Sequence, residues 1–274
     1  MQTFYNQAFE IRKLILESLS EAGSGHTGGS LGLADVFAVL YHKVLRHNPL
    51  KPEWNERDRL VLSIGHVAPV LYATLAHAGY FPVEELKTLR KLGSRLQGHP
   101  GRDFGLPGIE LSAGSLGQGL SVALGMALAD KMDNRSRRTY CILGDGELQE
   151  GSVWEAIMAA SHHQIDNLCA VVDRNGLQID GPTELVMKLE SLTDRWKAFG
   201  WNVISVDGHD QTALIEAFES AQKTREKPTV ILAKTIMGKG VKSIEDDYRW
   251  HGKAPSKEQL AVFLEELKNS RRYD

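Results

Sequence analysis

The apolar side chains of this chain follow two patterns, which predict helices and buried strands. Residues 4–20 carry apolar positions at the spacing of an amphipathic helix, and Gly23 and Gly25 follow it as stop signals. Short continuous runs of Val, Ile and Leu, such as residues 168–173, are typical of strands that are buried on both faces. The same patterns predict further helices at 33–46, 68–78, 82–92, 119–132, 151–164, 191–199, 211–224 and 256–269, and further strands at 59–63, 139–143, 202–206 and 229–234.

The order of these elements predicts the fold class. From residue 119 onward, apolar strands alternate with helices, which indicates an α/β fold with a mostly parallel sheet and helices on both faces, in three layers. No linker-like change of composition divides the chain, so we expect residues 1–274 to form a single domain. Two long irregular segments stand out, a Gly-rich passage at 93–119 and a polar loop at 240–254. A long loop inside a compact domain is usually functional.

Composition narrows the classes of function. The 274 residues are 42% hydrophobic and 24% charged, which is ordinary for a globular chain. A net charge of −3 gives no general basic field, so we expect neither nucleic acid nor a membrane as a partner. No leader-like segment opens the chain, and the default location is the cytoplasm. Cys141 and Cys169 lie inside apolar runs and are expected to be buried thiols rather than a disulfide framework.

One glycine motif is misleading. Residues 23–28 match G-x-G-x-x-G, the fingerprint of dinucleotide-binding folds. That fingerprint follows a strand, whereas here it follows the predicted helix 4–20. The sequence therefore does not indicate a nicotinamide cofactor.

The strongest chemical signal lies after two neighbouring predicted strands. Gly144, Asp145 and Gly146 follow the strand at 139–143, and Asn175 follows the strand at 168–173. Ligands of open parallel sheets bind at the carboxyl ends of the strands. Carboxylate and amide oxygens suit Mg²⁺, which usually keeps phosphate oxygens among its ligands. The helix that begins near residue 151 presents free N–H groups to an anion. Taken singly, Asp145 and Asn175 would also suit ordinary turns.

The G-D-G…N pattern resembles the magnesium–diphosphate motif of thiamin diphosphate enzymes, and the chain as a whole resembles the transketolase family. The likeness extends in order over residues 1–274. It rests on six short motifs: Gly25-His-Thr-Gly28, Ser63-Ile-Gly-His66, Gly98-His-Pro100, Gly114-Ser-Leu-Gly-Gln-Gly119, Gly144-Asp-Gly-Glu-Leu-Gln-Glu-Gly151 and Trp250-His-Gly252. The resemblance implies the three-layer thiamin-diphosphate-binding fold, and it implies that this chain is the diphosphate-binding domain.

The resemblance also implies roles for residues that would hold the cofactor. Asp145 and Asn175, with the backbone carbonyl of Leu177, would bind Mg²⁺, or Ca²⁺ or Mn²⁺ in its place. His66 and His251 would donate hydrogen bonds to the diphosphate.

A second set of residues would lie near the reacting atoms. Gly114 and Leu116 would contact the aminopyrimidine and thiazolium rings. His26 and His99 would reach sugar hydroxyls and handle protons near the reactive carbon, which suits imidazole near neutral pH. Glu150 would pair with a carboxylate across a subunit boundary.

The resemblance further implies a partner chain. In transketolases the glutamate that activates the cofactor lies in a second, pyrimidine-binding domain, and this sequence contains no such domain. We therefore expect the N-terminal subunit of a split transketolase, which would form a dimer of heterodimers with a C-terminal subunit. An exposed apolar face is expected where that partner docks. The implied activity moves a two-carbon ketol unit from a ketose, or ketose phosphate, to an aldose acceptor.

Two other classes of function stay open at this stage. The chain could be a subunit of another thiamin diphosphate enzyme, similar to deoxyxylulose-phosphate synthase or to a 2-oxo-acid dehydrogenase, or a non-catalytic cofactor-binding paralogue. Three departures from the usual family pattern leave the sugar undefined: Ile64, Gly101 in place of a frequent Glu, and Ser115 in place of a frequent Pro.

Overall fold

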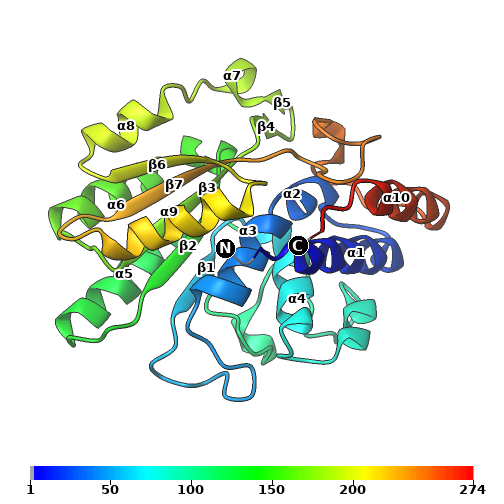
Figure 1. Cartoon of the computed structure of the whole chain (residues 1–274), viewed down its shortest axis with the longest axis horizontal. Helices are drawn as coiled ribbons and strands as arrows, with labels where there is room; N and C mark the ends of the chain where they lie inside the picture. Colours follow the sequence, from blue (N-terminus) through cyan, green and yellow to red (C-terminus); the bar gives the residue numbers. More distant parts are fainter. Residues whose placement is uncertain (1–2, 274) are drawn as a thin grey trace.

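A five-stranded parallel sheet forms the centre of the molecule (Figure 1), as seen in a computed structural model that describes residues 3–273. The strands are ordered β1-β2-β3-β7-β6, and every neighbouring pair is parallel. Their bounds are β1 Arg59–Leu62, β2 Thr139–Gly144, β3 Leu168–Arg174, β6 Asn202–Asp207 and β7 Thr229–Lys234. All five strands predicted from the sequence are therefore present; β2, β3 and β6 are each one residue longer than predicted, and β1 is one residue shorter.

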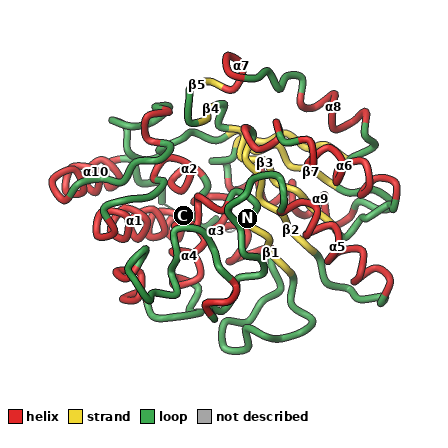
Figure 2. The backbone as a smooth tube through the Cα atoms, turned by 180° about the vertical axis from the view of Figure 1, so that it is seen from behind, coloured by secondary structure: helices red, strands yellow, loops and turns green. Residues whose placement is uncertain are grey.

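Helices cover both faces of the sheet and make the three predicted layers (Figures 1 and 2). One apolar core gathers the N-terminal helices, α9 and α10 on one face, and a second core gathers α5, α6 and α8 on the other. The main helices are α1 Tyr5–Ala22, α2 Thr27–Gly32, α3 Ala34–Val39, α4 Ala68–His77, α5 Gly119–Met132, α6 Gly151–His162, α8 Leu192–Ala198, α9 Gln211–Lys223 and α10 Lys257–Asn269. Short helical turns complete the chain: η1 Leu40–Val44, η2 Gly65–Val67, η3 Val83–Thr88, η4 Arg102–Phe104, η5 Gly146–Gln149, α7 Thr183–Val186 and η6 Tyr248–Trp250.

The inner strands β2, β3 and β7 are buried along almost their whole length because their side chains are apolar without alternation, whereas the edge strand β6 is partly exposed. Every residue of β3 up to Asp173 is buried, and Cys141 and Cys169 are buried free thiols as predicted. Parallel pairing places all five carboxyl ends at one edge of the sheet. The loops that follow β1, β2, β3 and β7 therefore meet at that edge.

Two local predictions were wrong or incomplete. The helix expected over 82–92 is a short 3₁₀ turn that ends at Thr88, because Leu89 is extended and Arg90 adopts a positive φ of 61°. The N–H of Arg90 instead donates to the carbonyl of Leu96 at 2.8 Å and closes a loop. A two-stranded hairpin of β4 Leu177–Gln178 and β5 Gly181–Pro182, which was not predicted, follows β3.

The hairpin and α7 project beyond the carboxyl edge of the sheet (Figures 1 and 2). This segment exposes large apolar side chains, with Leu185 82% and Met187 61% exposed. α10 packs along α1, and Arg271 donates to Asn6 at 2.9 Å, so the two ends of the described chain lie close together (Figure 1). No helix within residues 3–273 is long and apolar enough to cross a membrane.

Candidate active site at the carboxyl edge of the sheet

The loops that carry the predicted metal ligands lie against each other. β2 and β3 pair with Gly144 beside Asp173, so Asp145 and Asn175 leave the sheet at the same edge. Asp145 Oδ2 accepts a hydrogen bond from Gly176 N at 2.7 Å. The structure thus brings together the two loops whose convergence the strand pattern predicted.

Hydrogen bonds fix the orientation of Asn175. Its Nδ2 donates to Asp173 Oδ2 at 2.9 Å, and its Oδ1 accepts from Leu177 N at 2.9 Å. Asp173 is fully buried, and burial raises its pKa to about 7. The amide of Asn175 is therefore held between a buried carboxyl group and the backbone of Leu177, the third predicted ligand.

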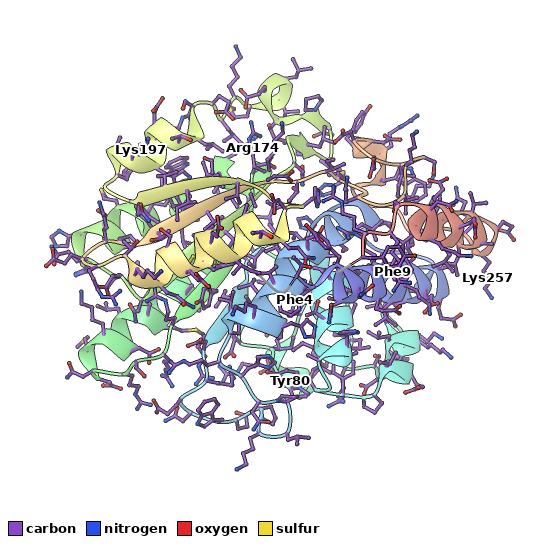
Figure 3. All side chains as sticks on the ribbon, viewed as in Figure 1. Phe4, Phe9, Tyr80, Arg174, Lys197 and Lys257 are labelled. Carbon is purple, nitrogen blue, oxygen red and sulfur yellow. The ribbon has the colours of Figure 1, made fainter. Side chains whose placement is uncertain are left out.

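Arg174 is a prominent contact of Asp145 that no motif of the sequence indicated. Its Nη1 donates to Asp145 Oδ2 at 3.0 Å and to Thr183 Oγ1 at 2.8 Å, while Nη2 donates to Glu190 Oε1 at 2.8 Å. Figure 3 shows Arg174 at the end of the sheet, beneath the hairpin. Burial raises the pKa of Asp145, and the guanidinium opposes that shift. Asp145 Oδ1 accepts from Gly146 N at 2.8 Å, and an oxygen with this single contact among the described residues can also bind a cation.

The four predicted histidines converge from four distant segments. The ring centroids of His26 lie 5.0 Å from His66, 6.2 Å from His99 and 5.6 Å from His251. Burial lowers the pKa of His66 to about 3 and that of His26 to about 4, so these rings are neutral near pH 7. His26 Nδ1 is buried with no hydrogen-bond partner among the described residues. A buried polar atom of this kind is free to bind a ligand.

The loop that precedes α5 lies between the histidines and the metal-ligand loops. A Cβ placed on Gly114 would lie 3.7 Å from His99 Cγ, so the loop passes directly over that ring. Leu116 is half-buried against the core. Gly117 N donates to Glu147 Oε1 at 2.9 Å, which ties this loop to the residue that follows the G-D-G motif.

Glu150 lies at the rim of the site, at the N-terminus of α6, and its side chain is exposed. Gly117 has a φ of +80°, and a Cβ there would lie 2.7 Å from Glu150 Cβ, so only glycine lets the two segments approach. Beside this rim, Gln149 Nε2 donates to the carbonyl of Met187 in the exposed apolar segment. The expected pairing of Glu150 with another subunit stays a prediction.

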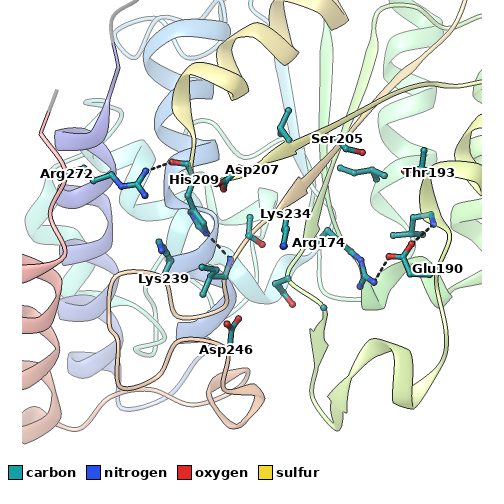
Figure 4. A pocket seen from close by; sticks show the side chains of 17 residues that line it. Arg174, Glu190, Thr193, Ser205, Asp207, His209, Lys234, Lys239, Asp246 and Arg272 are labelled. Atoms are coloured by element: carbon teal, nitrogen blue, oxygen red, sulfur yellow. Dashed lines mark hydrogen bonds and ion pairs between the residues drawn. The ribbon is translucent and has the colours of Figure 1, made fainter.

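A cavity of about 1000 Å³ opens beside the loops of Asp145 and Asn175 rather than at the histidines (Figure 4). It lies beyond the carboxyl ends of β3, β6 and β7, and its lining includes Asn175, Arg174 and Lys234. None of the four histidines lines it. The candidate site is therefore located by its side chains rather than by the size of a cavity. These are the histidine cluster with its unpartnered imidazole nitrogen and the oriented Asn175.

The donor set suits a magnesium diphosphate group. Asp145 and Asn175 supply hard oxygen ligands, which Mg²⁺ prefers. Within residues 3–273 no group of three or more His, Cys, Asp or Glu side chains is placed to hold a metal ion. A metal bound by Asp145 and Asn175 would have to take further ligands from the backbone and from phosphate. Neutral imidazoles can donate N–H groups to phosphate oxygens.

Comparison with known proteins defines the class of this domain. The sequence profile described as "Transketolase, thiamine diphosphate binding domain" matches residues 5–269. The transketolase of Campylobacter jejuni has a similar structure, with a TM-score of 0.91 and 37% identity, over 98% of this chain and 43% of that one. The chain thus has the fold of a thiamine diphosphate binding domain.

Relatives of matching length are named as subunits. The chain is 46% identical over 262 residues to the 6-deoxy-6-sulfo-D-fructose transketolase subunit SqwG of Clostridium sp. strain MSTE9, covering 96% of this chain and 95% of that one. It is 43% identical to one of the apulose-4-phosphate transketolase subunits of Phocaeicola vulgatus, covering 97% and 94%. It covers 42% of the human transketolase, at 41% identity over 97% of this chain. The chain belongs to the transketolase family.

Proposed function

We propose that this chain is the diphosphate-binding subunit of a two-chain transketolase. The observation that carries the proposal is the convergence of His26, His66, His99 and His251 beside the loops of Asp145 and Asn175. Relatives named as transketolase subunits that match this chain along nearly their whole length support the two-chain arrangement.

Asp145, Asn175 and the carbonyl of Leu177 would hold Mg²⁺, which in turn binds the diphosphate of thiamin diphosphate. His66 and His251 would donate hydrogen bonds to the same diphosphate. The bound cofactor supplies the nucleophile that adds to a ketose carbonyl and allows the next carbon–carbon bond to break.

Residues of this chain would bind the sugar hydroxyls and transfer protons near that nucleophile. Burial keeps His26 neutral near pH 7, so its ring can donate one hydrogen bond and accept another. His99, the exposed ring of the cluster, faces the loop of Gly114 and can accept or release a hydroxyl proton. The products are an aldose shortened by two carbons and a new ketose.

A cation beside the histidines favours anionic sugars. The guanidinium of Arg90 packs against Gly98, since a Cβ there would lie 2.7 Å from Arg90 Nη1. Its charge lowers the pKa of His99, after the larger effect of burial. The named relatives act on a sulfo-sugar and a sugar phosphate, which also carry anionic groups. We infer a ketose donor with a terminal phosphate or sulfonate.

The missing part of the site would come from a chain with a pyrimidine-binding domain. The exposed apolar segment around Leu185 and Met187, next to the metal-ligand loops, suits such a contact. The cytoplasm is the proposed location, since free thiols such as Cys141 and Cys169 suit a reducing compartment.

The test is reconstitution. The purified chain is mixed with a candidate partner, thiamin diphosphate and Mg²⁺, and ketose donors are offered with an aldose acceptor. The proposal expects two-carbon transfer by the pair and none by either chain alone. Full activity of this chain alone would contradict it. Rapid decarboxylation of pyruvate would instead favour another class of thiamin diphosphate enzyme, and the absence of cofactor binding by the pair would favour a non-catalytic paralogue.

A further inference from the structure

One buried carboxylate, that of Glu147, connects the segments of the proposed cofactor site. Glu147 directly follows the G-D-G motif, and only 2% of its surface is exposed. Its Oε1 accepts from Ser63 Oγ and from Gly117 N, and its Oε2 accepts from Gly144 N at 3.1 Å. No basic side chain pairs with it through any ion pair of the described residues.

The three donors belong to three different parts of the site. Ser63 begins the segment that leads from β1 to His66, Gly117 lies in the loop of Gly114 and Leu116, and Gly144 precedes Asp145. The contact network extends one step further, because Ser63 Oγ accepts from Gly119 N at 3.1 Å at the start of α5. These segments are far apart in the sequence and meet at this carboxylate.

We propose that Glu147 is a positioning residue, which sets the relative placement of the His66, Gly114–Leu116 and Asp145 segments so that they can grip one magnesium diphosphate cofactor. The inference rests on the proposed function and deepens it. Glu147 itself would not touch the cofactor. Partners that orient the residues in contact with a ligand commonly change affinity by about 10- to 100-fold when they are mutated.

The substitution Glu147→Gln tests the geometry with almost no change of volume. A carboxamide keeps one acceptor oxygen and gains an NH₂ group. If the NH₂ points toward Gly144, the N–H of Gly144 loses its acceptor, and if it points the other way, the N–H of Gly117 does. In either orientation one of the two loops is released from its anchor, while the fold keeps both apolar cores.

Asp58→Asn is the matched control. Asp58 is also a buried carboxylate, 5% exposed, and accepts from Arg46 N at 2.9 Å and Arg138 N at 2.8 Å. It directly precedes β1, at the opposite edge of the sheet from the site. Both variants remove one charge–amide contact, and Asp58→Asn also removes the ion pair between Asp58 Oδ1 and Arg46 Nη2 at 3.1 Å, so a purely structural effect should be at least as large in the control.

The first measurement needs no ligand. Amide hydrogen exchange of the full chain is followed by NMR at a temperature where circular dichroism shows each variant to be folded. Glu147→Gln is expected to speed exchange at Gly117 or Gly144 by about tenfold or more, whereas Asp58→Asn speeds it at Arg46 or Arg138 only. Unchanged exchange at both glycines in Glu147→Gln would overturn the inference.

The second measurement uses Mn²⁺ and thiamin diphosphate as the probe, with binding read from the relaxation of water protons. The dissociation constant is expected to rise about 10- to 100-fold in Glu147→Gln and to stay unchanged in Asp58→Asn. Equal affinity in wild type and Glu147→Gln would overturn the inference and leave the proposed function intact. If the wild-type chain, with or without its partner, binds no cofactor, the proposed function fails first.

Discussion

Replacing His66 by glutamine should change how the stability of the ligand-free chain depends on pH. Burial, followed by the charges of His251 and His26, lowers the pKa of His66 from 6.5 to about 3. The unfolded chain binds a proton at this residue below about pH 6.5, whereas the folded chain keeps the ring neutral down to its lowered pKa. The unfolded state therefore binds more protons between these values, and stability falls as the pH falls through this window.

The magnitude follows from the two pKa values. Lowering the pH from about 7 to about 5 should remove about 2 kcal/mol of unfolding free energy through His66 alone. This change in free energy depends little on the pKa of His66 in the folded chain, because that pKa lies well below about pH 5. Urea denaturation of wild type and His66→Gln at both pH values isolates the contribution of His66 to the pH dependence, since the other titrating groups contribute to both proteins. Between the higher and the lower pH, the wild type should lose about 2 kcal/mol more unfolding free energy than His66→Gln does. An extra loss below about 0.5 kcal/mol would contradict a strongly lowered pKa of His66.

Three further substitutions test the packing of α5 and a buried ion pair. A Cβ on Gly119 would lie 2.6 Å from Ser63 Cα, whereas one on Gly125 of the same helix meets no atom within 4 Å. Urea denaturation should thus show Gly119→Ala losing about 1–3 kcal/mol and Gly125→Ala gaining up to about 1 kcal/mol, and equal effects would contradict the packing. Asp35 is buried and pairs with Arg12, so Asp35→Ala should cost about 3–5 kcal/mol by the same assay; a loss below about 1 kcal/mol would show that the pair contributes little.

Much of the fold could be predicted because its strands are continuous apolar runs and its long helices are periodic. The 3₁₀ turn at Val83–Thr88 could not, because its end depends on the positive φ of Arg90 and on a hydrogen bond to Leu96. The hairpin after Asn175 was missed for a related reason. Each of its strands has only two residues, which is too short to show any period.

The residues of the candidate site also differ in how far the sequence could predict them. Asp145 and Asn175 follow strand ends, so the topology of a parallel sheet was enough to predict that they meet. His26 and His99 lie in glycine-rich loops, and only the resemblance to a family suggested that they converge. Glu147 gave no signal at all, because a glutamate in a polar segment is usually exposed, and its burial appears only when three loops close over it.

Arg174 changes the expected electrostatics of the proposed metal site. It lies against Asp145 and also bonds Glu190, so the buried carboxylate already has a cationic neighbour before any metal binds. The interaction explains how a carboxylate that is only 2% exposed tolerates burial in the ligand-free chain. Because Oδ2 of Asp145 accepts hydrogen bonds from Arg174 and Gly176, Oδ1 is the oxygen that is available to a metal.

The most direct test of the central claim is a calorimetric titration of thiamin diphosphate into the reconstituted two-chain protein, with and without Mg²⁺, for wild type and Asp145→Asn. We expect metal-dependent binding to the wild-type protein, weakened by about 10-fold or more in Asp145→Asn. We also expect the wild-type pair, and not the variant pair, to transfer a two-carbon unit. Binding that is equally tight without Mg²⁺, or unaffected by Asp145→Asn, would contradict the assignment of this sheet edge as the magnesium–diphosphate half of a transketolase site.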